Sequence, residues 1–130
     1  VVLRGHEAEV TGATFSPDGR WVVTASADRT ARLWNAAADG SEHAVLHGHM
    51  QAVTGAAFSP DGRHFATSCH DKFIWLWNVD HPNRPVARLP IGEETGPLLF
   101  SRDGSQLAAA SRGGGWRSCC RACPNCCDRW

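Results

Sequence analysis

The sequence predicts an all-β fold built from repeated four-stranded antiparallel sheets, and three observations support this. Residues 10–20 (VTGATFSPDGR) recur as residues 53–63 (VTGAAFSPDGR), and the flanking matches keep this 43-residue spacing, so one structural unit is present twice. Each unit holds short runs rich in β-branched and aromatic residues, which are typical of strands. Gly, Pro, Asp and Ser separate these runs, as in tight turns between antiparallel strands.

The first unit divides into four expected strands. Residues 10–15 form the first strand, and the SPDG turn ends it because Pro fixes φ and Asp-Gly tolerates positive φ. Residues 21–26 and 30–34 form the next two strands, joined by a turn at residues 27–29. A polar, alanine-rich stretch leads to a fourth strand at residues 43–46. Four short strands per repeat fit one blade of a β-propeller.

A third, looser copy of the unit begins near Leu89. It includes Phe100-Ser101, which stand 42 residues after Phe58-Ser59, and the match fades after Arg112. We therefore expect a domain of blades over residues 1–112, with no recognisable third strand in the last blade. Residues 113–130 are expected to form a disordered or irregular tail rich in Cys, Arg, Gly and Trp.

The Gly-His dipeptide, the SPDG turn and a Trp six residues after an Asp resemble the WD-repeat family of β-propellers. The resemblance covers residues 1 to about 112, and it implies a partial propeller of about two and a half four-stranded antiparallel blades. Asn35 and Asn78 follow the Trp where the family usually has Asp. The resemblance also implies a structural tetrad in each complete blade. The tetrad residues are His6, Thr24, Asp28 and Trp34 in the first blade, and His49, Thr67, Asp71 and Trp77 in the second.

The need to satisfy buried polar groups explains why such tetrads form. Blades pack face to face, so a polar side chain between them must find a hydrogen-bond partner. A chain from indole N–H to hydroxyl to imidazole to carboxylate satisfies all four groups. The third copy has Glu93 after its Gly, and Ala109, Gly113 and Cys119 stand at the Thr, Asp and Trp positions. No third tetrad is expected.

Composition and charge argue against several classes of function. Thirteen Lys and Arg balance thirteen Asp and Glu, whereas nucleic-acid-binding domains usually carry a basic surplus. No apolar run is long enough for a membrane span, and we expect no secretory leader. We expect no nucleic-acid or membrane partner and a cytoplasmic location. We also expect no enzymatic activity and no cofactor, since neither a nucleophile elbow nor a phosphate-binding loop occurs.

The resemblance implies a non-catalytic scaffold that binds other proteins or peptides through loops on a rigid frame. In the family's layout, the loops around Gly-His and around the tetrad Asp share one rim. The contact candidates on that rim are Arg4, Glu7, Arg29, His47, Met50, His70 and Lys72. The alternative is the regulatory propeller of an enzyme, a kinase or a nucleotide-hydrolysing protein, whose catalytic domain lies outside this chain.

Trp75 is a further partner-binding candidate. It lies two residues before Trp77 and therefore on the same face of its strand, where the first copy has Arg32. Either it is a binding anchor, since Trp is enriched at interface hot spots, or it packs against the neighbouring blade.

Two groups of residues raise a metal hypothesis. His43, His47 and His49 lie near one strand end, where the competing interpretation is simple solvation. In the tail, a metal or redox site is a second alternative function, although the iron–sulfur pattern lacks its fourth Cys. Its candidate ligands are Cys120, Cys123, Cys126 and Cys127. The biased composition of residues 113–130 instead favours a frameshift-derived segment.

A closed propeller needs about four to eight blades, so this chain cannot close one. We expect it to be a piece of a longer protein whose remaining blades cover its ends, or to assemble with other copies. Alone, it should not behave as a stable monomer, because strand edges and blade faces are left uncovered.

Overall fold

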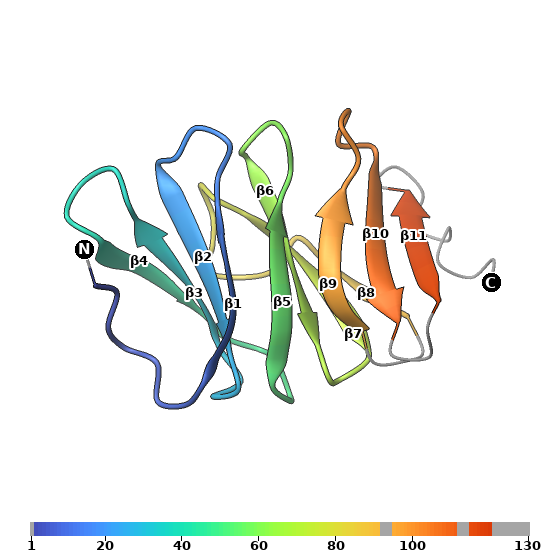
Figure 1. Ribbon diagram of the computed structural model, residues 1–130, viewed down its shortest axis with the longest axis horizontal. Coiled ribbons are helices and arrows are strands. Elements are labelled where there is room, and N and C mark those ends of the chain that lie inside the picture. The colour runs from blue at the N-terminus through green and yellow to red at the C-terminus, as the bar shows by residue number, and fades with distance from the viewer. Residues whose placement is uncertain (1, 92–94, 112–114, 121–130) are drawn as a thin grey trace.

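The computed structural model describes residues 2–91, 95–111 and 115–120. Over these residues, eleven β-strands form three antiparallel sheets (Figure 1). The same residues contain no helix, and hence none that could cross a membrane. The predicted all-β fold of antiparallel blades is confirmed.

Each repeat forms one sheet, and we call the sheets blade 1, blade 2 and blade 3. Blade 1 has the strand order β1 (Val10–Phe15), β2 (Trp21–Ser26), β3 (Ala31–Asn35) and β4 (Ser41–Leu46). Blade 2 repeats this order with β5 (Val53–Phe58), β6 (His64–Cys69), β7 (Phe73–Asn78) and β8 (Ala87–Pro90). Blade 3 consists of β9 (Thr95–Phe100), β10 (Gln106–Ser111) and β11 (Trp116–Cys120).

The expectation that the third copy lacks a third strand is wrong. β11 pairs with β10 so that Leu107 lies opposite Cys119, the register in which Phe65 lies opposite Trp77 in blade 2. Antiparallel pairing uses backbone N–H and C=O groups, and these remain available when the side chains change. The expected irregular tail is therefore corrected for residues 116–120. Residues 121–130 lie outside the described part of the chain.

The SPDG segments form the tight turns that the sequence predicts. Gly19 has a φ of +73° and donates its backbone N–H to Ser16 O at 2.9 Å. The Ser16 hydroxyl donates to Asp18 Oδ1 at 2.6 Å, which lowers the pKa of that carboxyl. In blade 3, Ser101 and Asp103 make the same contact at 2.7 Å.

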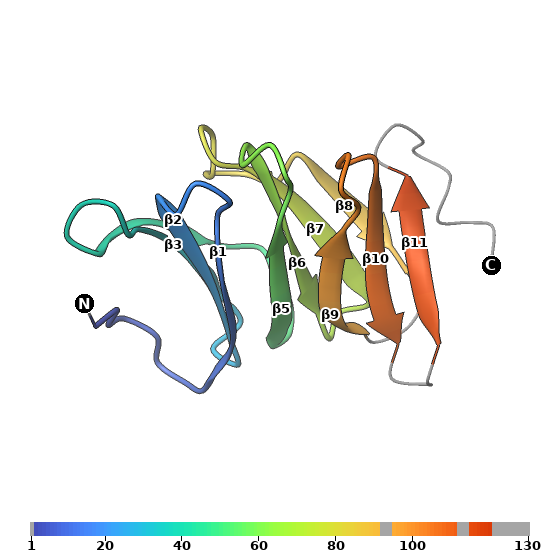
Figure 2. The same ribbon diagram turned by 45° about the horizontal axis from the view of Figure 1, so that its top comes forward.

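The blades stand side by side, with their first strands β1, β5 and β9 adjacent (Figures 1 and 2). Glycines allow this close approach: a Cβ on Gly55 would lie 3.1 Å from the backbone oxygen of Gly96. Hydrogen bonds also join the blades here. Thr11 Oγ1 donates to Val53 O at 2.5 Å, and Ser68 Oγ donates to Gly96 O at 2.8 Å.

Two apolar cores fill the spaces between blades. Between blades 1 and 2, Val23 and Leu33 pack with Phe65 and Trp77, and all four are at most 2% exposed. Between blades 2 and 3, the core residues are Ala57, Ala66, Ile74, Ile91, Leu98, Phe100, Leu107 and Ala109. Each blade is therefore stabilised mainly by burial against its neighbour.

Candidate functional site

The structure brings the four expected tetrad residues of blade 1 together. Trp34 Nε1 donates to Thr24 Oγ1 at 2.9 Å, and His6 Nε2 lies 2.7 Å from the same hydroxyl. His6 Nδ1 donates to Asp28 Oδ2 at 2.8 Å. The directions agree when the imidazole carries its proton on Nδ1, because the Thr24 hydroxyl then donates to Nε2. Every polar group in this chain of contacts has a partner.

Asp28 also organises the two loops that meet over blade 1. It accepts hydrogen bonds from the backbone N–H of Glu7 at 3.1 Å and from Thr30 N and Oγ1 at 2.8 and 2.6 Å. Burial by itself raises the pKa of Asp28, but the hydrogen bonds from Thr30, His6 and Glu7 outweigh it and hold the pKa well below its usual value. The carboxylate is thus ionised and joins the segment before β1 to the β2–β3 turn.

Blade 2 completes only part of this network. Trp77 Nε1 donates to Thr67 Oγ1 at 3.0 Å, and His49 Nε2 lies 2.8 Å from that hydroxyl. Among the described residues, however, His49 Nδ1 has no hydrogen-bond partner of good geometry, and Asp71 does not fill that role. Burial lowers the pKa of His49 to about 4, against the opposing effects of the Asp71 charge and the Leu46 carbonyl.

Trp75 is hydrogen-bonded to the Asp71 carboxylate, which the resemblance assigned to His49. Its indole Nε1 donates to Asp71 Oδ2 at 3.2 Å, and its ring stacks on Trp77 at 6.1 Å between centroids. Trp75 is only 6% exposed and belongs to the core between blades 1 and 2. The interpretation of Trp75 as an exposed binding anchor is therefore wrong. A large aromatic side chain gains more from burial here than from exposure to water.

The glycine of each Gly-His pair lies against the residue at the Trp75 register. Gly48 has a φ of +124°, and a Cβ on it would lie 3.1 Å from the Trp75 ring. Gly5, with a φ of +155°, lies in the same way against the Arg32 guanidinium. Arg32 in turn forms an ion pair with Glu42 on β4. Glycine is needed because the loop approaches the strand closely with a backbone that other residues rarely adopt.

Sequence reasoning missed the aromatic stack on blade 2. The Arg88 guanidinium lies 4.4 Å from the Phe73 ring centroid and 5.4 Å from the Trp75 ring. The sequence signal for this contact was that blade 2 has Trp75 at the position where blade 1 has Arg32. An aromatic ring at this position can form a cation–π contact with a nearby Arg.

The expected rim exists as one edge of blades 1 and 2, the lower edge in Figure 1. We call it the aspartate rim and define it by the loops at residues 4–9, 27–30, 47–52 and 70–72. Backbone hydrogen bonds from Ala27 N to Glu9 O at 2.9 Å and from His70 N to Ala52 O at 3.0 Å join these loops in pairs. Exposed side chains on the rim are those of Arg4, Glu7, Arg29, His47, Met50 and Lys72, whereas His70 is half-buried.

The histidines of the metal hypothesis do not converge. His43 packs against Trp21 with ring centroids 4.7 Å apart, whereas His49 is buried against Thr67. Over the described residues, no group of three or more His, Cys, Asp or Glu side chains is placed to hold a metal ion. The side chain of Cys120 and the tail residues Cys123, Cys126 and Cys127 lie outside the described part, so that hypothesis stays a prediction.

Cys69 is a buried free thiol in blade 2. Its Sγ donates to Gln51 O at 3.2 Å, and burial raises its pKa to about 11. The thiol is therefore protonated at neutral pH, and a protonated thiol is a poor nucleophile. Cys69 serves packing rather than chemistry.

Comparison with known proteins identifies the repeats. The family model "WD domain, G-beta repeat" matches residues 1–35 and 40–78, together more than half of the chain. The Notchless protein homolog of Arabidopsis thaliana is 52% identical over 33 residues, which are 25% of this chain and 7% of that protein. The U3 small nucleolar RNA-associated protein 21 of Saccharomyces cerevisiae is 47% identical over 38 residues, which are 29% of this chain and 4% of that protein.

A third relative is the probable cytosolic iron-sulfur protein assembly protein 1 of Sclerotinia sclerotiorum. It is 36% identical over 42 residues, which are 32% of this chain and 9% of that protein. Each match thus spans less than a tenth of the relative's length and about one repeat of this chain. The repeat spacing, the four-stranded blades and the family match agree, and the chain belongs to the WD-repeat family.

Proposed function

We propose that this chain is a non-catalytic scaffold for protein–protein interaction and that it binds proteins or peptides through the aspartate rim. The observation that carries the proposal is that exposed side chains on that rim stand on a backbone fixed by hydrogen bonds. Charged and apolar side chains project into solvent from loops that Asp28 and the paired backbone hydrogen bonds hold in place. Loops fixed by a rigid frame bind partners with little loss of entropy.

Met50 and Lys72 form the centre of the proposed contact surface on blade 2. Met50 is 70% exposed, and its backbone N–H approaches Asp71 Oδ2 at 3.5 Å. Lys72 follows Asp71 directly, is exposed, and has a φ of +69°. An exposed apolar side chain and a cation on two joined loops fit a partner segment that combines an apolar residue with an acidic one.

Selection from a displayed library of random peptides, followed by titration of the enriched peptides, tests this function. We expect enriched peptides to carry an acidic residue near an apolar one and to lose at least tenfold in affinity against a Met50→Asp, Lys72→Glu double variant. Val86→Asp is the matched control, because Val86 is 60% exposed but precedes β8, outside the rim. Equal binding to wild type and double variant would contradict the proposal.

We also propose that the protein is cytoplasmic and that its partner is not a nucleic acid. A cytoplasmic location is supported by the word "cytosolic" in the name of the Sclerotinia relative, whereas the yeast relative's name refers to a nucleolar RNA. A net charge of +0 supports a partner other than nucleic acid. Imaging of the tagged protein in cells distinguishes the two locations.

A further inference from the structure

Three positions differ together between the two complete repeats and form a cation–aromatic stack on blade 2 but not on blade 1. At the 43-residue spacing, these positions hold Thr30, Arg32 and Val45 in blade 1, and Phe73, Trp75 and Arg88 in blade 2. The strand pairing agrees, since Arg32 lies opposite Val45 and Trp75 lies opposite Arg88. We call Phe73, Trp75 and Arg88 the outer stack, because β8 is the edge strand of its sheet.

The outer stack holds the Arg88 guanidinium in place. Its Cζ lies 4.4 Å from the Phe73 ring centroid and 5.4 Å from that of Trp75, and a cation over a ring face is attracted by the π electrons. Trp75 is fixed in turn by its hydrogen bond to Asp71 and by stacking on Trp77. Arg88 is nevertheless exposed. A partner that binds this guanidinium therefore loses little entropy in ordering it.

Stacking leaves the hydrogen-bond donors of Arg88 available. A guanidinium stacks through its face, whereas its N–H groups point outwards in its plane. None of the ion pairs within the described part of the chain involves Arg88. In blade 1, by contrast, Arg32 is paired with Glu42, and the residue 43 positions after Glu42 is the uncharged Pro85. Blade 1 thus neutralises its arginine internally, whereas blade 2 exposes one to the solvent.

The outer stack adjoins the aspartate rim. It begins at the first residue of β7, directly after the rim loop at residues 70–72. A Cβ on Gly48 would lie 3.1 Å from the Trp75 ring, so the rim loop that carries Met50 lies against the same indole as Arg88 does. One short peptide segment can therefore contact the rim and the guanidinium together.

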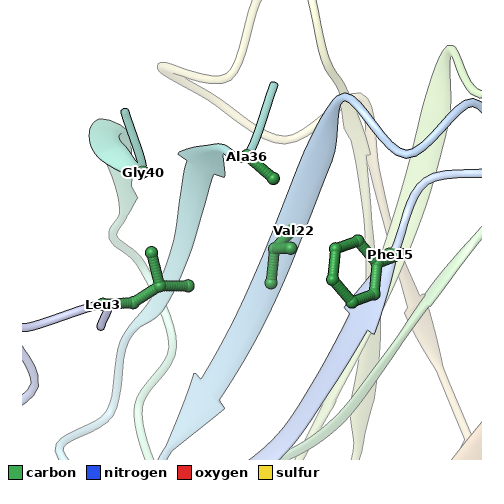
Figure 3. A pocket seen from close by; sticks show the side chains of 5 residues that line it. All are labelled: Leu3, Phe15, Val22, Ala36 and Gly40. Atoms are coloured by element: carbon green, nitrogen blue, oxygen red, sulfur yellow. The ribbon is translucent and has the colours of Figure 1, made fainter. Parts of the chain in front are cut away.

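A pocket on blade 1 has different chemistry. It has a volume of about 250 Å³ and is lined by Leu3, Phe15, Val22, Ala36 and Gly40 (Figure 3). None of these side chains carries a charge or a hydrogen-bond donor. This pocket offers nothing to an acidic group, in contrast to the outer stack.

We infer that Arg88 is a binding site for a carboxylate of the partner, an Asp or Glu side chain that accepts two parallel N–H···O hydrogen bonds from the guanidinium. The inference rests on the proposed function and identifies the group that recognises the acidic residue of the bound peptide. One planar guanidinium matches one carboxylate, whereas phosphate groups are usually recognised by clusters of arginine. The apolar residue of the same peptide contacts Met50.

NMR titration of the full chain with sodium acetate tests the site without any peptide. The readout is the Arg88 Nε–H signal, assigned by its loss in Arg88→Lys, with sodium chloride holding the ionic strength constant. We expect acetate to shift this signal at least three times as far as the Arg63 Nε–H signal. Arg63 is exposed on an SPDG turn, and no cation–π contact of the described residues involves it. Equal shifts at the two arginines would overturn the inference.

Peptides enriched from the displayed library provide the second test, in which charges are exchanged. Arg88→Glu should lower the affinity for an acidic peptide at least tenfold. The same variant should bind that peptide with Lys in place of the acidic residue at least tenfold more tightly than the wild type does, a gain that misfolding cannot produce. Arg63→Glu is the matched control, because it makes the same change in charge at the edge opposite the aspartate rim (Figure 1). It should change the affinity less than twofold.

Two further variants complete the peptide test. Arg88→Gln removes the charge with a smaller change in the side chain and should also weaken binding, and circular dichroism verifies that each variant keeps its strands. Glu93→Gln, Glu94→Gln removes the two carboxylates that follow β8 in the sequence and should not lower the affinity. A tenfold loss in this double variant would overturn the inference.

The remaining outcomes separate this inference from the proposed function. A library that enriches no acidic peptide would overturn both. Acidic peptides that bind Arg88→Glu as tightly as the wild type, or lose equally against Arg63→Glu, would overturn the role of Arg88 alone. A phosphoserine version of the peptide that binds the wild type tenfold more tightly than the Glu version would overturn the choice of a carboxylate.

Discussion

Trp75 Nε1 donates to Asp71 Oδ2 at 3.2 Å and thereby engages the oxygen whose counterpart on Asp28 accepts from His6. This one contact distinguishes two repeats that share the Gly-His pair and the SPDG turn. The indole stacks on Trp77 with ring centroids 6.1 Å apart, and it also contacts the His49 ring, whose centroid lies 5.0 Å away, and Gly48. As a result, blade 2 keeps the contacts of the Thr67 hydroxyl and the backbone contacts of Asp71, but it lacks the hydrogen bond between His49 and Asp71.

Replacement of Trp75 by Phe should restore the missing contact. The variant keeps an aromatic ring but removes the N–H that engages Asp71, so His49 Nδ1 can donate to the carboxylate. We expect the pKa of His49 to rise from about 4 towards its ordinary value of 6.5. Proton NMR titration of the His49 ring measures this shift. In the control Trp21→Phe, whose ring contacts His43 instead, the His49 titration should not change.

The depressed pKa of His49 predicts a loss of stability in mild acid. Below about pH 6.5 the unfolded chain binds a proton on this residue that the folded chain does not, until the pH reaches about 4. Over this window the free energy of unfolding should fall with decreasing pH by up to about 1.4 kcal/mol per pH unit. Urea unfolding at several pH values measures the slope. A His49→Gln variant that keeps the full slope would show that another group is responsible.

Removal of the Asp28 carboxylate should destabilise blade 1. Asp28→Ala leaves His6 Nδ1 and the backbone N–H groups of Glu7 and Thr30 without their acceptor, at a cost of about 1–3 kcal/mol. Asp39→Ala is the control, because Asp39 is exposed and contacts its near neighbour Ser41, whose backbone N–H donates to it at 2.9 Å. The control should change the free energy of unfolding by less than about 0.5 kcal/mol. Equal effects from both substitutions in urea unfolding would argue against the tetrad.

The Thr67 hydroxyl should contribute more to the stability of the fold than the small size of this side chain indicates. Its hydroxyl is 0% exposed, accepts from Trp77 and contacts His49. Thr67→Val keeps the shape of the side chain but leaves the Trp77 indole N–H and the His49 imidazole without their hydrogen-bond partner. We expect this to lower the free energy of unfolding by about 1–3 kcal/mol. Thr14→Val, a half-buried position on β1, serves as the reference. Thermal unfolding followed by circular dichroism compares the two, and a smaller effect at Thr67 than at Thr14 would contradict the network.

Gly48 should tolerate alanine less well than Gly19 does. Both have positive φ, which costs a non-glycine residue about 1–2 kcal/mol. At Gly48 the added Cβ also lies 3.1 Å from the buried Trp75 ring, whereas at Gly19 it has no heavy atom within 4 Å. Gly48→Ala should therefore lower the melting temperature further than Gly19→Ala. Similar melting temperatures would mean that the Trp75 ring moves aside without cost.

The sequence was sufficient for everything that depends on local chemistry and repetition. The 43-residue period, the SPDG turns and the short β-branched runs identify the strands of blades 1 and 2 to within two or three residues. The resemblance to the WD-repeat family supplied the tetrad residues, and the 43-residue repeat places the second set at positions equivalent to the first. The same reasoning failed for β11, where backbone pairing persists after the side-chain pattern is lost.

Tertiary structure alone decided which polar partners meet and which faces stay open. His49 and Asp71 stand at the tetrad positions in sequence, yet the choice between His49 and Trp75 as the donor to Asp71 depends on how an indole fits beneath Gly48. Phe15 and Phe58 are identical in repeat position, yet one is exposed and the other packed in a core, because only Phe58 has a preceding blade against it. Local pattern determines the blade, whereas competition for one acceptor and the presence of a neighbour are properties of residues far apart in the chain.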